Sequence, residues 1–570
     1  MAGFDFMSLQ WCLQVLAKKG ACPEFLARLQ NLYSNNYSVV VVNNIPGAAV
    51  KNVRLTLRQG DIPSMELFSF GIDPLLCLLE RVLQGILICS IPVLGPKPQH
   101  GPPPPPVELR YKVIGYADDS KPAITSMQEF TLVDKSLTLF ENASGCKVHR
   151  DPASMKCKFL PLGRWRNTLE QTDIPCNYMT LADHLDMVGV TLKATWTQTR
   201  KVNGDAIQQR VDNTVKPWKA GKFMPITQRR WSLNSFALSK VWFRTRCVPL
   251  RECDFKKISS SCKSWLYQDR FAKPEETVLH RPHHYGGLAL HSVKYKSMAG
   301  FITTFLQTAT NPKFRQNLLH NLLFRKYVLG EDVQAAPNPP PPYLPLDMFA
   351  IIKKVKEETP LNITTMAEKD WTRLLTEDFV TMTVVSDSGQ QQFTPCRAEV
   401  ASPTTDWTRC WSACRQPGIP PDFASFLWLM MHDLLCTQVK LHRMGSTNSP
   451  MCKMQGCVED GTLQHELLDC SKNDGVGQRL IHCLQKYQPG LQPGDVLRLD
   501  HGDIADDLVL PLALLTAITL CFIWKERNLG NSVRTYKVRA ELEQYITLLR
   551  TTRLVTPTAT LSNMVSLMFQ

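Results

Sequence analysis

The segment Val107–Thr125, VELRYKVIGYADDSKPAIT, constrains the fold most, because it predicts two adjacent carboxylates at the tip of a strand pair. An alternating, β-branched run leads to Tyr116, and a second short run follows Asp118 and Asp119. Two like charges repel at close range, so this pair costs free energy when the protein folds alone. Carboxylate oxygens suit Mg²⁺ or Mn²⁺, which would offset the repulsion. The segment therefore predicts a metal-binding hairpin, with a plain Asp-Asp turn as the alternative.

Charge and cysteine content narrow the class of partner and the compartment. A formal net charge of +14 favours an anionic partner, with nucleic acid as the first candidate. The 19 cysteines lie at irregular spacings, which favours reduced thiols in an intracellular protein of the nucleus or cytoplasm. Residues 508–524 form a long uncharged run of 17 residues with Pro511 inside it. This run favours a buried helix over a membrane span, so no membrane partner is expected.

Helical and strand patterns alternate on both sides of the hairpin. Helices are expected over residues 8–33, 63–88 and 127–144, the last with Gly145 as its C-cap. Strands are expected at 37–42, with 53–57 as its partner, near 157–162, and at 186–192. This order predicts an α+β domain built on an antiparallel sheet for residues 1–192.

Four motifs in this region resemble, in order, those of LINE-type (non-LTR) retrotransposon reverse transcriptases. Gly115–Asp119 resembles their Y/F-x-D-D core, and residues 29–44, LQNLYSNNYSVVVVNN, resemble an L-Y-x-n-x-x-S-x-V-x-V-N-G segment. Arg58–Gly60 resembles the R-Q-G that opens a helix contacting template and nucleotide, and Ser144–Val148 resembles a downstream S-G-L-K-V. The resemblance implies a polymerase palm over roughly residues 1–192, which extends a DNA primer on an RNA template.

The resemblance also implies roles for single residues. Asp118 and Asp119 would hold Mg²⁺ (or Mn²⁺) for phosphoryl transfer. Lys147 would donate a proton to the pyrophosphate leaving group, with a solvated surface lysine as the alternative. The contacts to template or incoming nucleotide would come from Arg58, Gln59, Gly60 and Tyr116.

This sequence departs from the family at the first catalytic aspartate. Gly3-Phe4-Asp5 resembles the last three positions of the D-x-x-K-A-F-D pattern that carries the first catalytic Asp, with Gly in place of Ala. That Asp would fall before Met1, so the resemblance implies an N-terminally truncated palm without the acid expected to bridge both metals. We therefore predict a protein that derives from an RNA-directed DNA polymerase and is inactive because the first catalytic Asp is missing. The sequence leaves open whether it is an enzyme. The alternatives are a non-catalytic nucleic-acid-binding protein and a fragment with no stable fold.

Residues 216–246 combine positive charge with aromatic rings and contain no acid. Lysine and arginine neutralise phosphates, while aromatic rings stack on bases. The alternative places the rings in the core and the charges on a solvated face. The resemblance assigns residues 193–330 to a helical thumb that grips RNA template and DNA primer, or another nucleic acid. The predicted contacts are Lys216, Trp218, Lys219, Lys222, Arg229, Arg230, Trp231, Lys240, Arg244 and Arg246.

Two less defined segments follow. Residues 280–291, HRPHHYGGLALH, contain four histidines, for which a metal site and a structural loop are both possible. Pro282 and the glycines favour the loop, and Gly286–Leu288 resembles part of a G-G-L-G-L segment of LINE-type proteins. Residues 331–420 contain a Pro-rich linker, AAPNPPPPYLP, and a region without a defined pattern.

Four soft metal ligands occur close together at the spacing Cys452-x4-Cys457-x7-His465-x4-Cys470. A Cys₃His set suits tetrahedral Zn²⁺. Because residues five apart on an α-helix are about 140° apart, Cys470 reaches His465 only if the helix ends or bends before it. The spacing therefore predicts a zinc knuckle, with unmetallated thiols as the alternative.

The arrangement is similar to the Cys/His knuckle near the C-terminus of LINE-type proteins. Phe426–Trp428 and Leu441–Gly445 resemble the F-x-W…L…H-R-x-G helix that precedes that knuckle, and Trp524–Asn528, WKERN, resembles the W-x-x-R-N that closes the module. The resemblance implies a mostly helical region over residues 421–570 that is linked to nucleic-acid binding.

Overall fold

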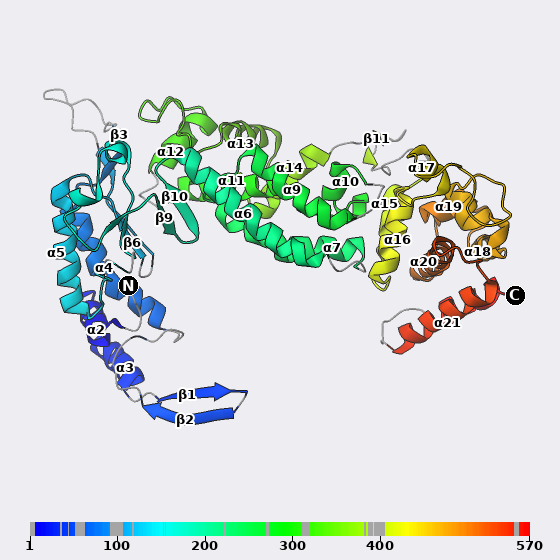
Figure 1. The fold of residues 1–570 in the computed structure, drawn as a ribbon, viewed down its shortest axis with the longest axis horizontal. Coiled ribbons are helices and arrows are strands. Elements are labelled where there is room, and N and C mark those ends of the chain that lie inside the picture. The colour runs from blue at the N-terminus through cyan, green and yellow to red at the C-terminus, as the bar shows by residue number, and fades with distance from the viewer. Residues whose placement is uncertain are drawn as a thin grey trace. The chain divides into compact units, whose positions relative to one another are not determined.

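The computed structural model describes residues 6–34, 37–43, 45–51, 57, 63–91, 107–116, 119–151, 153, 156–219, 224–268, 273–310, 318–380, 384–385, 391–392, 405–551 and 558–570. The chain divides into two compact units. Unit 1 comprises Met1–Asn203, Cys247–Pro249 and Thr304–Thr365, and unit 2 comprises Gly204–Arg246, Leu250–Thr303 and Met366–Gln570. Helices dominate and the strands are short (Figure 1), which confirms the predicted α+β class.

Unit 1 contains most of the strands. Its elements are α2 (Leu9–Lys18), α3 (Pro23–Ser34), β1 (Tyr37–Val42), β2 (Ile45–Lys51), α4 (Ser64–Val82), β3 (Ile86–Ile91), β4 (Val107–Tyr111), β5 (Val113–Tyr116), β6 (Asp119–Pro122), α5 (Met127–Ser144), β7 (Lys158–Phe159), η2 (Gly163–Asn167), η3 (Gln171–Asp173), β8 (Thr180–Leu181), β9 (His184–Met187), β10 (Val190–Lys193), the start of α6 (Trp196–Trp218), α12 (Leu318–Phe324), η7 (Arg325–Leu329) and α13 (Leu346–Glu358).

The strands differ from the predicted antiparallel sheet, and the helix predicted over 63–88 ends earlier, because α4 stops at Val82 and β3 begins at Ile86. Within the described residues the strands pair two by two, and β7 pairs with β8 in parallel. Strand β1 pairs with β2, because Asn43, at φ 51°, reverses the chain. The predicted partner strand 53–57 lies, apart from Leu57, outside the described residues. The predicted strand at 186–192 is a hairpin, with Val188 at φ 48° and Gly189 at φ 78° in its turn.

The apolar core of unit 1 supports the hairpin that carries Asp119. Helices α2, α4 and α5 pack together, with Phe68, Leu79 and Val133 buried between them. The hairpin of β5 and β6 pairs Tyr116 with Asp119, as the sequence predicts. A Cβ added to Gly115 would lie 2.8 Å from the Leu76 side chain of α4, so a glycine here lets the strand approach the helix closely.

Unit 2 is almost entirely helical. Its elements are the end of α6, α7 (Ile226–Ser232), η4 (Leu233–Ala237), α8 (Ser239–Thr245), α9 (Glu252–Tyr267), α10 (Glu276–His280), η5 (His283–Tyr285), most of α11 (Val293–Thr310), α14 (Glu368–Val380), β11 (Val384–Val385), β12 (Gln391–Gln392), α15 (Trp407–Ala413), α16 (Pro421–Met431), α17 (Gln438–Arg443), η8 (His465–Asp469), η9 (Ser471–Asn473), α18 (Val476–Gln485), α19 (Pro493–Arg498), α20 (Asp506–Asn528), α21 (Thr535–Thr551) and α22 (Thr558–Met568).

Helix α20 forms the centre of the unit 2 core. Among the described helices it is the one whose length and apolar composition match a membrane span, yet 67% of its apolar window is buried inside the protein. It packs against α16, α18, α21 and α22. This burial favours the predicted core helix over a membrane span.

The histidine-rich segment is a turn that the unit 2 core encloses. Gly286 has a φ of 76°, and a Cβ added there would lie 2.4 Å from Trp411 Cε2. Its carbonyl accepts a hydrogen bond from Trp428 Nε1 at 2.7 Å and lies 2.7 Å from His432 Nε2. The predicted structural loop is therefore confirmed, and its glycine is required by both conformation and space.

We expect Gly286→Ala to destabilise unit 2 by about 2–4 kcal/mol, because it adds a left-handed backbone penalty to overpacking against Trp411. The measurement is urea unfolding followed by tryptophan fluorescence. Gly530→Ala is the matched control, since Gly530 also has a φ of 76° but no atom within 4 Å of the added Cβ. Equal losses in the two variants would contradict the contact with Trp411.

Candidate zinc centre and nucleic-acid surface

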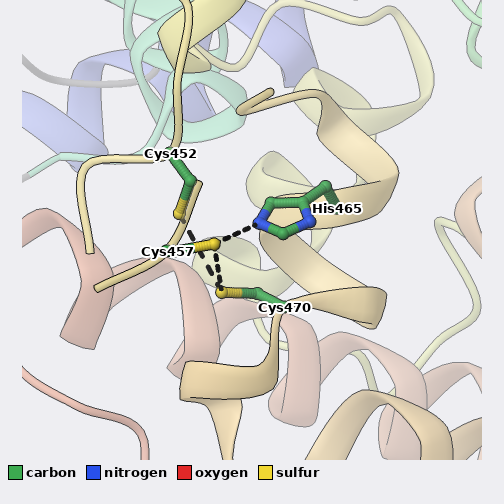
Figure 2. Close-up of side chains that lie close together, drawn as sticks. All are labelled: Cys452, Cys457, His465 and Cys470. Carbon is green, nitrogen blue, oxygen red and sulfur yellow. Dashed lines mark hydrogen bonds between the residues drawn. The ribbon is translucent and has the colours of Figure 1, made fainter. Parts of the chain in front are cut away.

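The four predicted zinc ligands converge on one point (Figure 2). One ligand atom from each of Cys452, Cys457, His465 and Cys470 lies within 4.8 Å of the others. The Sγ atoms of Cys452 and Cys470 are 3.9 Å apart, those of Cys457 and Cys470 are 4.0 Å apart, and Cys457 Sγ is 3.3 Å from His465 Nε2. Zn–S bonds of ~2.3 Å at tetrahedral angles place sulfurs ~3.8 Å apart. The donor set and its spacing therefore fit Zn²⁺.

A widened helical turn brings the last two ligands together. Residues His465–Asp469 form a π-turn, and Cys470 N donates to His465 O at 2.9 Å. The helix ends there, because Cys470 has an extended backbone with φ −62° and ψ 121°. From the sequence, the helix is required to end or bend before Cys470 if this residue is to reach His465. The π-turn and the end of the helix at Cys470 together fulfil this requirement.

Groups outside the ligand set donate to one ligand and lie close to a second. Arg527 of α20 is fully buried and donates from Nη2 to Cys452 Sγ at 2.9 Å and from Nη1 to Asn473 Oδ1 at 3.3 Å. His465 Nδ1, on the far side of the ring from the thiols, lies 2.9 Å from Glu459 Oε2. Such outer contacts orient metal ligands and tune their charge.

The charge on Cys452 reflects this surrounding. Burial raises the pKa of the Cys452 thiol. Hydrogen bonds from the Met454 backbone and from Arg527 outweigh this effect and lower the pKa to about 7. For Cys470 burial dominates and the pKa is raised. Cys452 is therefore the thiol that Arg527 prepares for metal binding as a thiolate.

The predicted polymerase residues are only partly described. Asp118, Arg58, Gln59, Gly60 and Lys222 lie outside the described residues, as does Asp5. Tyr116 lies in β5, and Lys147 is exposed after the end of α5. Asp119 forms an ion pair with Lys121 across one intervening residue of β6. The metal roles of the two acids remain predictions.

Asp119 lines a large cavity within unit 1. The cavity has a volume of about 1130 Å³, and its apolar walls include Leu79, Val133 and Trp165. The acidic residues of its lining are Asp119 and Asp186. The basic residues are more numerous: Lys121, His149, Lys156, Lys158, Arg164 and Lys193. The cavity beside Asp119 is therefore apolar inside and predominantly basic in its charged lining, which favours a ligand with an apolar body and negative charge.

The structure divides the predicted thumb contacts into an exposed and a buried group. Arg229 is only 3% exposed, places its guanidinium 5.3 Å from the Trp265 ring and donates to Leu266 O at 3.3 Å. Arg244 is 7% exposed. These two arginines have their side chains in the interior, so only the exposed residues of the segment remain as predicted phosphate contacts.

The exposed group forms a basic and aromatic surface. The Trp231 and Phe236 side chains are 56% and 51% exposed and their rings meet edge to face at 5.6 Å. Trp218 contacts Phe236 at 6.4 Å and lies between Lys216 and Lys219, both exposed. The further exposed cations of the segment are Lys240, which donates to Thr214 Oγ1 at 2.6 Å, and Arg246, which pairs with Glu368.

Sequence reasoning missed Arg527, Glu459 and Phe236 as members of these sites. Arg527 lies in the WKERN segment, so its motif was visible but its contact with Cys452, 75 residues away, was not. Glu459 lies inside the ligand spacing, where an acid near a metal-binding histidine is a usable signal. Phe236 is one of the aromatic residues of the basic segment, for which stacking was expected, but it was not among the named contacts.

Known proteins match the region of the zinc ligands and part of the whole chain. Residues 396–476 match the family described as zinc-binding in reverse transcriptase. The chain is also similar to the Transposon TX1 uncharacterized 149 kDa protein of Xenopus laevis, with 22% identity over 274 residues, covering 46% of this chain and 18% of that protein. These matches confirm the resemblance to reverse transcriptases of non-LTR retrotransposons and support a retrotransposon origin.

Proposed function

We propose that this chain is a nucleic-acid-binding protein of reverse-transcriptase origin. It binds RNA or DNA through residues 216–246 of unit 2, the thumb-like segment. The exposed pair of Trp231 and Phe236 beside Lys216 and Lys219 carries the proposal. Exposed aromatic rings are costly in water, and bases would cover them while the lysines neutralise phosphates. The net charge of +14 adds long-range attraction to any nucleic acid.

The zinc centre has a structural part in this proposal. Three thiolates and one imidazole complete a tetrahedral set, which leaves no open position for a substrate. Bound Zn²⁺ would hold residues 452–470 together beside α20. The family that matches residues 396–476 supports zinc as the metal.

We expect Trp231→Ala to weaken binding of a single-stranded RNA oligonucleotide about 5–150-fold, because one base-stacking platform is worth about 1–3 kcal/mol. The measurement is fluorescence anisotropy with the full chain. Tyr536→Ala is the matched control, since Tyr536 is 69% exposed in the same unit but outside the basic segment. Equal affinities of the wild type and Trp231→Ala would refute this surface.

A second candidate function is RNA-directed DNA polymerisation, which the basic cavity around Asp119 favours. In this proposal Asp118 and Asp119 hold Mg²⁺ or Mn²⁺ and Lys147 acts on the leaving group, with Arg58, Gln59, Gly60 and Tyr116 at the template and nucleotide. The test is primer extension on an RNA template with purified protein. Incorporation that disappears in Asp118→Ala supports the enzyme, and incorporation that persists in this variant shows a contaminating polymerase.

A further inference from the structure

Three side chains from separate segments of unit 2 meet beside the enclosed glycine turn. Arg230 of α7 contacts His283 Nε2 through its Nη2, and Arg415, which follows α15, places Nη1 2.6 Å from His283 Nδ1. Arg415 Nη2 also donates to Gly287 O at 3.1 Å. Helix α16 packs on α7 (Figure 1). Helix α15 packs on η5, so the elements that carry or precede the three side chains are in contact.

The cluster has more hydrogen-bond donors than acceptors. Burial, and then the charges of Arg415 and Arg230, lower the pKa of His283 to about 4, so its imidazole is neutral near pH 7. A neutral imidazole has one ring nitrogen with a lone pair and one that carries hydrogen. It therefore accepts from one guanidinium, and the other guanidinium points at an N–H group. In either tautomer of His283, one of the two arginines faces a ring N–H group and finds no lone pair on the ring to accept its hydrogen bond.

No carboxylate resolves this excess. Among the described residues, neither Arg230 nor Arg415 forms an ion pair, and Arg230 Nε is buried without a hydrogen-bond partner. Burial, and then the charge of Arg415, lower the pKa of Arg230 to about 10, and burial lowers the pKa of Arg415. Two cations held this close cost free energy until an anion joins them.

The cluster also reaches solvent. Arg230, His283 and Arg415 are all half-buried, and the next residue after Arg230 is the exposed Trp231 of the proposed binding surface. A phosphate has several acceptor oxygens and matches the planar forks of two guanidiniums. A half-buried position strengthens this attraction, because solvent screens it less than at a fully exposed lysine.

We propose that Arg230, His283 and Arg415 form an oxyanion site that holds one backbone phosphate of the nucleic acid bound at Trp231. The proposal rests on the proposed function for the identity of the ligand, since free phosphate has the same chemistry. His283 spaces the two guanidiniums and accepts from one of them, and the phosphate accepts from both. The site joins the thumb-like segment to the region that matches the zinc-binding family, so both parts contribute to one contact.

The test uses the full chain with Arg415→Gln, which removes charge but keeps a polar side chain. Arg409→Gln is the matched control, because Arg409 lies on α15 and is already paired with Asp503 at 2.7 Å. We expect Arg415→Gln to lower the affinity for single-stranded RNA about tenfold and to reduce the salt-dependence slope by about 0.7, the contribution of one phosphate contact. Thermal unfolding without ligand shows whether both variants keep the wild-type fold.

Inorganic phosphate separates this inference from the proposed function. We expect it to raise the unfolding temperature of the wild type and of Arg409→Gln, but not of Arg415→Gln. Wild-type RNA binding with an unchanged slope in Arg415→Gln would overturn the phosphate site while the proposed function stands. If the wild type binds no nucleic acid, the proposed function fails, and selective stabilisation by inorganic phosphate still supports the oxyanion site. Absence of that stabilisation as well would overturn the site.

Discussion

Removal of Zn²⁺ is expected to lower the free energy of unfolding of unit 2 by about 5 kcal/mol or more, a part of the ~10–16 kcal/mol that zinc contributes in isolated finger peptides. The reason is the composition of the local core. The small apolar cluster here consists of Cys452, Met454 and Cys470, with Cys457 packed against it, so the ligands themselves are most of that core. Between α17 and η8 the chain has one isolated bridge, Met451 with Asp460, as its regular structure.

Metal analysis of the purified protein should therefore find about one Zn²⁺ per chain, as a single tetrahedral site requires. Cys457→Ser should lose that metal and lower the unfolding temperature by roughly 10 °C or more, at about 2–4 °C per kcal/mol. Cys436→Ser is the matched control, because Cys436 is half-buried in the same unit but outside the ligand set. A wild-type protein that folds fully without metal would end the zinc hypothesis.

Features whose causes lie within a few residues were predicted from the sequence. The helix over residues 127–144 has its predicted bounds, because Ser126 N donates to Glu129 at its start and Gly145 takes a φ of 77° at its end. The zinc ligands were found in the same way, since donor type and spacing are local properties. The long apolar run was assigned to a buried helix because its 17 residues lie at the lower limit for a membrane span and include Pro511.

Features that depend on helix phase or on distant contacts were not predicted. A π-turn at Leu233–Ala237 interrupts the helical phase of the basic segment, so the interior positions of Arg229 and Arg244 do not follow from a regular period. The hairpin at 184–193 turns at a valine with positive φ, for which the sequence has no local signal before Gly189.

The second large effect is expected at Arg527, whose charge balances the metal centre. Zn²⁺ with three thiolates and a neutral imidazole has a net charge of −1, and Arg527 is the fully buried cation that donates to one of those thiolates. Arg527→Met should reduce zinc affinity about 10–100-fold, as loss of an outer-shell contact does elsewhere. Lys525→Met is the matched control, because Lys525 is exposed on the same helix. Competition with a calibrated chelator measures both affinities.

The same substitution should change the pH dependence of the metal-free protein. Cys452 has its pKa lowered from 9.0 to about 7 in the folded state, so its ionisation stabilises the fold fully above pH 9. This contribution is lost as the pH falls through 7, because the thiolate is then protonated in both states. In Arg527→Met the pKa of Cys452 should rise toward its unfolded value, which flattens the stability profile between pH 7 and 9. Urea unfolding of the chelated protein across this range measures the slope. An unchanged slope and an unchanged zinc affinity would together show that Arg527 only fills space, whereas a flattened slope with weaker zinc binding shows that its charge prepares the site.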